Sequence, residues 1–420
     1  MKQKLKEHKG ITLIALIITI IVLLILAVVA ISAVNGNGIL NHAQNAKTKY
    51  SEAQTNEQAR LDEYSEYLDT ESSKINGGGT VTKTLKDNLN TVLSTTDNTP
   101  LTDEYGNKIM LPAGFKILVD STTSYTADDI DVTKGIVIED TQTETAGNQF
   151  VWIPVGKIYT DAEKTEANAK TITLGRYVFK SDGTIDEELS QSTPEGQLKT
   201  DSYYYTEGKK NDTTTNAQAK DIEMFVSKSN SNGGYYIGRY EARVENYDDS
   251  NISEWSSSED WTGYVAESGK ELKLVSKANS QVWNYITQKK ASNLCKSMYT
   301  SKPYESDLIS SYAWDTAIIF FQKLGENPTY SRKTSVNRNK LAKHGTSGTD
   351  YSGTRDIICN VYDMASNCWE WSTESLNDLD LQTPLRGGNY KYRANYTSER
   401  NLQIMPYVGE HVSFRPVLYM

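Results

Sequence analysis

The sequence predicts an α+β protein in which a long hydrophobic and amphipathic N-terminal helix precedes an irregular domain of short strands and few helices. The prediction rests on an apolar run near the N-terminus, short aromatic strand-like segments from about residue 115 onward, and long polar stretches between them. Of the 420 residues, 37% are hydrophobic, and 27 are Tyr against 7 Phe and 7 Trp. Amphipathic aromatics in this proportion are typical of loop-rich, strand-containing folds rather than helical bundles.

The N-terminus combines a basic leader, residues 1–10, with a long apolar segment. The leader contains four lysines, and no charged residue follows it until Lys47. Residues 11–34 are almost wholly apolar, about 24 residues or roughly 36 Å as a helix, which is enough to span a bilayer. The lysines predict that the N-terminal end stays in the cytoplasm and that the rest of the chain lies outside. We therefore expect a location in the cell envelope, with the membrane as one partner, and a simple signal anchor would explain the same segment.

A leader that ends in Lys9 and Gly10, followed by this apolar run, resembles the N-terminal segment of type IV prepilins. The resemblance implies cleavage between Gly10 and Ile11 and assembly with other pilin-like subunits. Members of that family usually carry Glu at the fifth mature position, and that position is Ala15 here.

The rest of the chain divides by composition. Small, apolar and aromatic residues recur at spacings of three and four from Ile39 to Leu68, so we expect helix over residues 11–70. Gly, Ser and polar residues then predict a flexible linker over 71–110. The globular domain is predicted to occupy residues 111–420, with a polar surface insertion at about 157–232.

Within the domain, short apolar or alternating segments predict strands at residues 115–119, 135–139, 150–155 and 235–244. Near-helical spacing of apolar residues predicts two helices, over 280–298 and 307–324. We expect the second helix to end at Gly325, because a glycine followed by Pro328 is a typical stop signal.

Composition argues against several classes of site. The net charge of −10 disfavours nucleic acid as a partner, because phosphate binding needs clustered Lys and Arg. Only two of the four histidines, His344 and His411, fall in the globular part, which argues against a histidine-rich metal site. The three cysteines, Cys295, Cys359 and Cys368, allow at most one disulfide.

Residues 362–372 (YDMASNCWEWS) form the segment around which the domain is predicted to be organised. In a strand, Trp369 and Trp371 share one face and Glu370 points to the other. The segment therefore predicts a packed strand with a charged outer edge, since paired aromatics are usually core residues.

Two further motifs follow, an RGG triplet at Arg386 and a terminal FRPVL segment that contains Arg415. Each arginine flanks an apolar strand end, so we expect both to form structural ion pairs. Together, DMxxNxWEW, RGG and FRPVL resemble the formylglycine-generating enzyme family, the sulfatase-modifying branch of the C-type-lectin-like folds. The resemblance covers roughly residues 111–420 and implies that fold for the domain.

Catalytic members of that family carry two cysteines after the RGG triplet, which bind copper and activate oxygen. The matching positions here are Tyr392 and Thr397, and no cysteine follows Cys368. Soft sulfur ligands stabilise Cu(I), so we expect neither copper nor oxidase activity. The chain is accordingly predicted not to be an enzyme.

The same resemblance implies a structural calcium site. Its matching positions are Asp363, Ser366, Cys368 and Glu370, the middle two through backbone oxygen, and hard oxygen donors suit Ca²⁺. The family usually has Gly at the position of Ser366. The alternative is that the acids are satisfied by backbone amides or by Arg386.

Residues 389–409 are dense in Tyr, Asn, Ser and Arg, the composition that adaptable binding surfaces use. They resemble the variable region of lectin-fold proteins altered by diversity-generating retroelements. We predict a surface here for a protein or glycan ligand, with these candidates: Asn389, Tyr390, Tyr392, Asn395, Tyr396, Ser398 and Tyr407. The alternative is a solvated loop of a Tyr-rich protein.

These expectations favour a cell-surface pilin-like protein that displays a non-catalytic, lectin-fold, ligand-binding head for adhesion or recognition. An extracellular oxidase of the formylglycine-generating type and a purely structural pilus subunit are the alternatives.

Overall fold

The computed structural model describes residues 83–193, 198–200, 204–207, 219–254, 258, 260–334, 356–376, 382–391, 395–404 and 406–420. All of these belong to one compact unit, Thr82–Met420. The helix predicted over residues 11–70 lies outside the described residues, and so do the processing positions Gly10 and Ile11.

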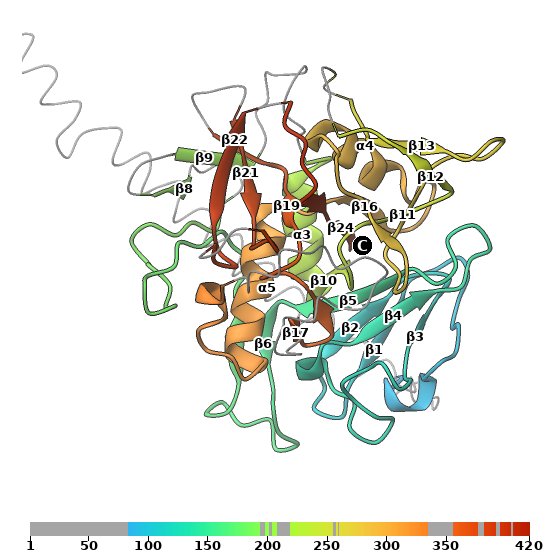
Figure 1. Ribbon diagram of the computed structural model, residues 1–420. Helices are drawn as coiled ribbons and strands as arrows, with labels where there is room; N and C mark the ends of the chain where they lie inside the picture. Colours follow the sequence, from blue (N-terminus) through green and yellow to red (C-terminus); the bar gives the residue numbers. More distant parts are fainter. Residues whose placement is uncertain are drawn as a thin grey trace, which may run out of the picture. The chain divides into compact units, whose positions relative to one another are not determined.

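A six-stranded sheet forms the centre of the domain, and its strands come from distant parts of the sequence (Figure 1). Every neighbouring pair in it is antiparallel. The predicted strands at 115–119, 135–139 and 150–155 are confirmed. The strand predicted at 235–244 is two strands, β10 of this sheet and β11 (Arg243–Glu245) of a three-stranded sheet. The strand order is β16 (Glu305–Leu308), β24 (Pro416–Tyr419), β10 (Gly234–Gly238), β5 (Gln149–Pro154), β4 (Val137–Asp140) and β3 (Phe115–Ile117).

A four-stranded sheet contains the two tryptophans of residues 362–372. Its order is β22 (Arg400–Ile404), β21 (Gln382–Arg386), β19 (Trp369–Trp371) and β23 (Val412–Phe414). β19 pairs antiparallel with β21 and parallel with β23, so the RGG and FRPVL motifs flank it on opposite sides.

Smaller sheets complete the β structure. One three-stranded sheet has the order β14 (Lys273–Val275), β11 (Arg243–Glu245) and β15 (Gln281–Val282). The other has the order β20 (Glu374–Leu376), β9 (Tyr204–Glu207) and β8 (Leu198–Lys199). The two-stranded pairs are β1 (Thr99–Thr102) with β2 (Lys108–Leu111), β6 (Gly156–Ile158) with β7 (Lys170–Ile172), β12 (Tyr247–Ile252) with β13 (Tyr264–Ala266), and β17 (Ile357–Ile358) with β18 (Val361–Tyr362).

The described helices are α3 (Ile222–Ser231), α4 (Gln288–Ser297) and α5 (Ser311–Leu324), with the 3₁₀ turns η1 (Lys86–Asn88), η2 (Val132–Lys134) and η3 (Tyr330–Arg332). Each α-helix begins at a side-chain cap, because Asp221, Thr287 and Ser310 accept a backbone N–H three residues ahead at 2.8, 3.4 and 3.2 Å. α5 ends at Gly325 as predicted, and the N–H of Gly325 donates to the Phe321 carbonyl at 3.0 Å.

α5 is the apolar centre of the larger of two main cores. All of its residues from Ser311 to Phe321 are buried, as expected of a helix enclosed on every side. The Tyr235 hydroxyl on β10 donates to the Ala313 carbonyl at 2.7 Å and ties α5 to the central sheet. The second core gathers the buried aromatic residues of three other segments, Trp283, Trp369, Trp371 and Phe414.

The predicted fold class is wrong. Strands predominate among the described residues, and the α-helices there have only 10, 10 and 14 residues. No helix in the described ranges is long and apolar enough to span a bilayer. The prediction gave weight to an apolar run that lies outside those ranges. It also took as loop many strands of two to four residues, which are too short to show a periodic pattern.

Boundaries within the domain also differ from the prediction. The segment predicted as flexible linker is folded from Lys83 onward, since Leu85 and Leu101 are fully buried in the larger core. The predicted polar insertion contributes α3 and the buried Phe225 to the same core. The helix predicted over 280–298 begins only at Gln288, because Gln281 and Val282 pair with β11.

Gly387, in the RGG triplet, lets the chain turn closely against α5. Its φ is +78°, and a Cβ there would stand 2.4 Å from the Met364 carbonyl oxygen and 3.2 Å from the Trp314 ring. A left-handed backbone and a backbone contact this close together admit only glycine.

We expect Gly387→Ala to destabilise the full chain by about 3 kcal/mol, the sum of left-handed strain and overpacking. Gly269→Ala is the matched control, because Gly269 also has a φ of +78° but would meet nothing within 4 Å. The control should lose only about 1 kcal/mol. Urea unfolding of both variants measures the difference, and equal losses would show that the close contact does not matter.

Candidate functional site

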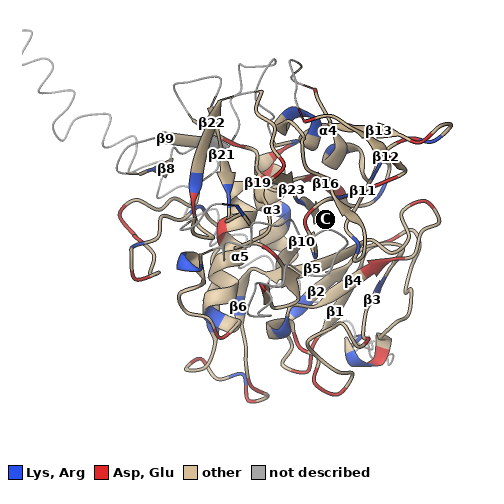
Figure 2. Cartoon of the chain, viewed as in Figure 1, with Lys and Arg blue, Asp and Glu red and all other residues tan. Residues whose placement is uncertain are grey.

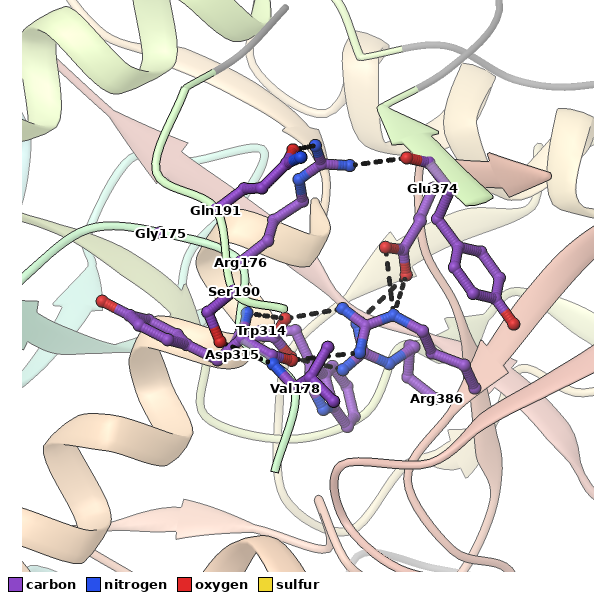
Figure 3. Close-up of polar contacts among 12 residues, drawn as sticks. Gly175, Arg176, Val178, Ser190, Gln191, Trp314, Asp315, Glu374 and Arg386 are labelled. Atoms are coloured by element: carbon purple, nitrogen blue, oxygen red, sulfur yellow. Dashed lines mark hydrogen bonds and ion pairs between the residues drawn. The ribbon is translucent and has the colours of Figure 1, made fainter. Parts of the chain in front are cut away.

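A buried cluster of four charged side chains lies beside the predicted binding segment, residues 389–409 (Figure 3). It contains Arg386, which precedes that segment, and Arg400, which lies within it. We call Asp315 on α5, Glu374 on β20, Arg386 on β21 and Arg400 on β22 the ion cluster. Arg400 donates to Asp315 Oδ2 at 2.7 Å and to Glu374 Oε2 at 2.8 Å. Arg386 pairs with Asp315 and lies 3.4 Å from Glu374 Oε2. Three of the side chains are fully buried and Arg400 is 8% exposed, so two cations and two anions neutralise one another inside the core.

Backbone groups extend the ion cluster into neighbouring segments. The Tyr177 N–H donates to Asp315 Oδ2 at 2.9 Å, and Arg386 Nε donates to the Glu399 carbonyl at 3.0 Å. Figure 2 shows a basic segment on each of β21 and β22, where Arg386 and Arg400 lie opposite each other in the register. Burial alone would raise the pKa of Asp315, but the two guanidinium groups outweigh it and hold that pKa below its usual range. A carboxyl that stays ionised in this way is suited to structural pairing rather than to proton transfer.

A second buried ion pair organises the segment with the two tryptophans. Arg415 donates to both oxygens of Glu370, at 2.6 and 3.0 Å, and to the Gly238 and Tyr362 carbonyls at 2.8 and 2.9 Å. The predicted structural pairing of Arg386 and Arg415 is therefore confirmed. The charged outer edge is wrong, because Glu370 is fully buried and faces Arg415 instead of solvent.

Glu241 holds the turn before β19, and it was not among the predicted site residues. Its carboxylate accepts the backbone N–H of Cys368 at 2.8 Å and the side-chain amide of Asn367. Burial, with Asp363 and Glu370 close by, raises its pKa well above the usual range. Two signals were available in the sequence. One is the single acid, Glu241, in the strand-like segment YYIGRYEARV, and the other is Asp315 within the apolar sequence of α5.

The predicted calcium ligands Asp363, Ser366, Cys368 and Glu370 are all buried in one turn and strand. Asp363 Oδ1 accepts the Ser366 hydroxyl at 3.2 Å. Both Glu370 oxygens accept hydrogen bonds from Arg415, so a calcium ion bound by this donor set would share the Glu370 carboxylate with a guanidinium. Within the described ranges, no group of three or more His, Cys, Asp or Glu residues is arranged to hold a metal ion. Calcium stays a prediction.

Three of the predicted ligand-binding residues are internal. Asn389, Tyr390 and Ser398 are 0%, 5% and 9% exposed. The Tyr390 N–H donates to the Asn367 carbonyl at 2.9 Å, and the Ser398 hydroxyl donates to the Ser331 carbonyl at 2.9 Å. These residues hold the segment in place through backbone and side-chain contacts, and they offer little surface to a ligand.

The remaining predicted positions differ among themselves. Asn395, Tyr396 and Tyr407 are half-buried, and Tyr392 lies outside the described residues. Tyr396 is covered on its ring by the guanidinium of Arg332, with Cζ 3.5 Å from the ring centroid. The accessible part of the predicted surface, among described residues, is therefore Asn395, Tyr396 and Tyr407, with Arg332 added by the structure.

The two positions that hold cysteines in the resembled oxidases are not equivalent here. Tyr392 lies outside the described residues, whereas Thr397 is buried and its hydroxyl donates to the Lys333 carbonyl at 3.3 Å. The Thr397 carbonyl accepts the Trp314 indole N–H at 2.9 Å. All three cysteines of the sequence are described and none is disulfide-bonded, and burial raises the pKa of each thiol.

His411 lies beside the aromatic side chains of the second core. Its Nε2 is 3.2 Å from the Tyr407 hydroxyl, and its ring centroid is 5.2 Å from that of Trp369. Burial lowers the pKa of His411 to about 4, and the charge of Lys391 lowers it further while Glu410 opposes this. The imidazole is therefore neutral in the folded protein at neutral pH.

We expect Asp315→Asn to destabilise the full chain by about 3–5 kcal/mol, because it leaves a buried guanidinium charge uncompensated. The matched control is Glu166→Gln, which removes the exposed partner of Lys157 at 2.8 Å. That change should leave the unfolding free energy nearly unchanged, since exposed pairs contribute little. Chemical denaturation compares the two, and similar effects would mean that the ion cluster does not support the fold.

We also expect acidification to destabilise the fold through His411. Its pKa is depressed from 6.5 to about 4. The contribution of the neutral imidazole to the unfolding free energy is therefore fully present above pH 6.5 and is lost as the pH falls towards 4. His411→Gln should lose less unfolding free energy than the parent chain between pH 7 and pH 4. Burial raises the pKa of Asp307 to about 6, so acidification acts on stability through Asp307 in the opposite direction. Asp307 is present in both chains, so its effect cancels in the comparison. Parallel pH profiles of the two chains would contradict the assignment.

No protein-family model matches the sequence, and no curated protein is significantly similar to it. The function has to follow from the chemistry of the site itself.

Proposed function

We propose that this protein is a non-catalytic binding protein of the cell surface. Its pilin-like N-terminal segment attaches it to the cell envelope, among other pilin-like subunits. Its C-terminal domain binds a protein or glycan ligand through the accessible residues of the segment between β21 and β22. The function is adhesion or recognition.

The observation that carries this proposal is how residues 387–399 are held. They connect Arg386 to Arg400, which are opposite each other in the β21–β22 register and both belong to the ion cluster. The segment is thus a long connection with both ends fixed in the core, and it is rich in Tyr and Asn. Loops positioned by a rigid scaffold are where binding residues concentrate.

A non-catalytic role is supported by the chemistry of the same region. The resembled oxidases need two cysteines, and this chain has Tyr392 and Thr397 at those positions. The Thr397 side chain is engaged with backbone, and the carboxylate of Asp315 is held in its ionised form by arginine. Attachment to the envelope is supported by the sequence of residues 1–34, with its lysine-rich leader and apolar run.

The binding role can be tested with the full chain on arrays of glycans and cell-surface proteins. We expect the double variant Asn395→Ala/Tyr396→Ala to lose the captured ligands, because its two side chains lie on the accessible part of the segment. The double variant Tyr105→Ala/Asn168→Ala changes the same residue types on other loops and should keep them. Ligands retained equally by both variants would remove residues 387–399 as the binding surface. A chain that captures nothing would favour a structural subunit.

A further inference from the structure

Arg332 differs from every other described arginine. The other six side chains are buried and donate to partners within the fold: Arg176, Arg239, Arg243, Arg386, Arg400 and Arg415. Arg332, at the end of η3, is half-buried, and its guanidinium has no hydrogen bond or ion pair to a described residue. A guanidinium without a carboxylate partner among the described residues, close to the predicted binding segment, is a candidate for binding an external anion.

The contact between Arg332 and Tyr396 is a stacking contact. Its Cζ lies 3.5 Å from the Tyr396 ring centroid, whereas the other described arginine–aromatic contacts lie between 5.3 and 5.7 Å. Stacking uses the flat face of a guanidinium and leaves its in-plane N–H donors for an acceptor. Paired N–H groups in one plane match the two oxygens of a carboxylate.

The sequence that follows Arg332 is basic. The adjacent Lys333 is already neutralised, because its ammonium pairs with Asp356 at 2.5 Å. By sequence, residues 332–355 contain six Lys and Arg residues and a single acid, Asp350, in a chain whose net charge is −10. A basic stretch attracts acidic ligands, and here it stands out against a chain whose overall charge is negative.

We propose that Arg332, stacked on Tyr396, binds a carboxylate of the ligand, and that the ligand is a carboxylate-bearing polysaccharide. This rests on the proposed binding function and names its ligand class. Asn395 lies beside Tyr396, and Thr334 pairs with Tyr396 through an isolated β-bridge. The side chains of Asn395 and Thr334 are small and polar, and so suited to sugar hydroxyl groups.

A polysaccharide fits this surface better than an acidic peptide. Peptide ligands gain affinity by burying large apolar anchors in pockets. The large hydrophobic residues exposed in the described part of the chain are Val92, Val265 and Ile404, and none is adjacent in sequence to Arg332 or Tyr396. A polyhydroxylated ligand needs a charge and polar neighbours, which Arg332, Asn395 and Thr334 provide.

The test measures binding of the full chain to three immobilised polymers: polygalacturonate, neutral dextran and polyglutamate. We expect polygalacturonate to bind, dextran not to bind and polyglutamate to bind weakly. Arg332→Ala should weaken polygalacturonate binding about tenfold or more, the scale of a charge-assisted bidentate contact. Arg332→Lys should be nearly as weak, because it keeps the charge but loses the planar pair of donors.

Lys108→Ala on β2 is the matched control, since it removes one exposed positive charge that has no ion pair to a described residue. It should leave binding unchanged, and unchanged melting temperatures would exclude misfolding of the Arg332 variants. The proposal is overturned if the parent chain does not bind polygalacturonate, if polyglutamate binds as tightly, or if Arg332→Ala and Lys108→Ala have equal effects. If Asn395→Ala/Tyr396→Ala loses the array ligands while Arg332→Ala keeps them, the proposed binding function is supported and the role of Arg332 is refuted.

Discussion

The pairing of Arg386 and Arg400 with two buried carboxylates is the constraint on which the proposed binding segment, residues 387–399, depends. Four charges removed from water are tolerated only while each has its partners, so the ion cluster is formed completely or not at all. It also selects the register of β21 and β22. A slip of one residue in either strand would turn that strand's arginine to the other face of the sheet and leave Asp315 and Glu374 with only one cation in the core. Charge compensation thus determines where residues 387–399 begin and end.

The same principle fixes the neighbouring segment with its two tryptophans. Arg415 holds Glu370 from one side, and the Glu241 carboxylate holds the backbone of Cys368 from the other. The aromatic rings of Trp369 and Trp371 supply apolar burial, but burial is not directional and does not fix a turn. The hydrogen bonds of Glu241 and Glu370 are directional, and they specify which conformation the apolar contacts stabilise. The domain combines nonspecific aromatic packing with a few charged contacts that select one arrangement.

The sequence predicted local patterns well, but it did not predict which residues are buried by segments far away in the chain. The central strands and the end of α5 at Gly325 followed from alternation and stop signals, and the pairing of Arg386 and Arg415 followed from charges beside apolar strand ends. The burial of Glu370 did not follow, because its partner lies 45 residues away in the chain. The burial of Asn389 was missed for the same reason, since composition describes a segment and not what covers it. No local signal placed Arg332 on Tyr396, because their contact exists only after η3 and the β21–β22 connection come together.

The division between held and accessible residues also limits how the binding segment can vary. Composition alone treats every Tyr, Asn and Ser of residues 389–409 as equally free to change. In the structure, Asn389 and Ser398 lie inside the fold, and Ser398 bonds to the backbone of a distant segment, so substitutions there would disturb the frame before they altered a ligand. Asn395 and Tyr396 lie on the accessible side, where a new side chain changes the surface and leaves the ion cluster intact. The proposed binding surface can therefore change at few positions without disturbing the fold, and those positions lie between the two ends that Arg386 and Arg400 fix in the core.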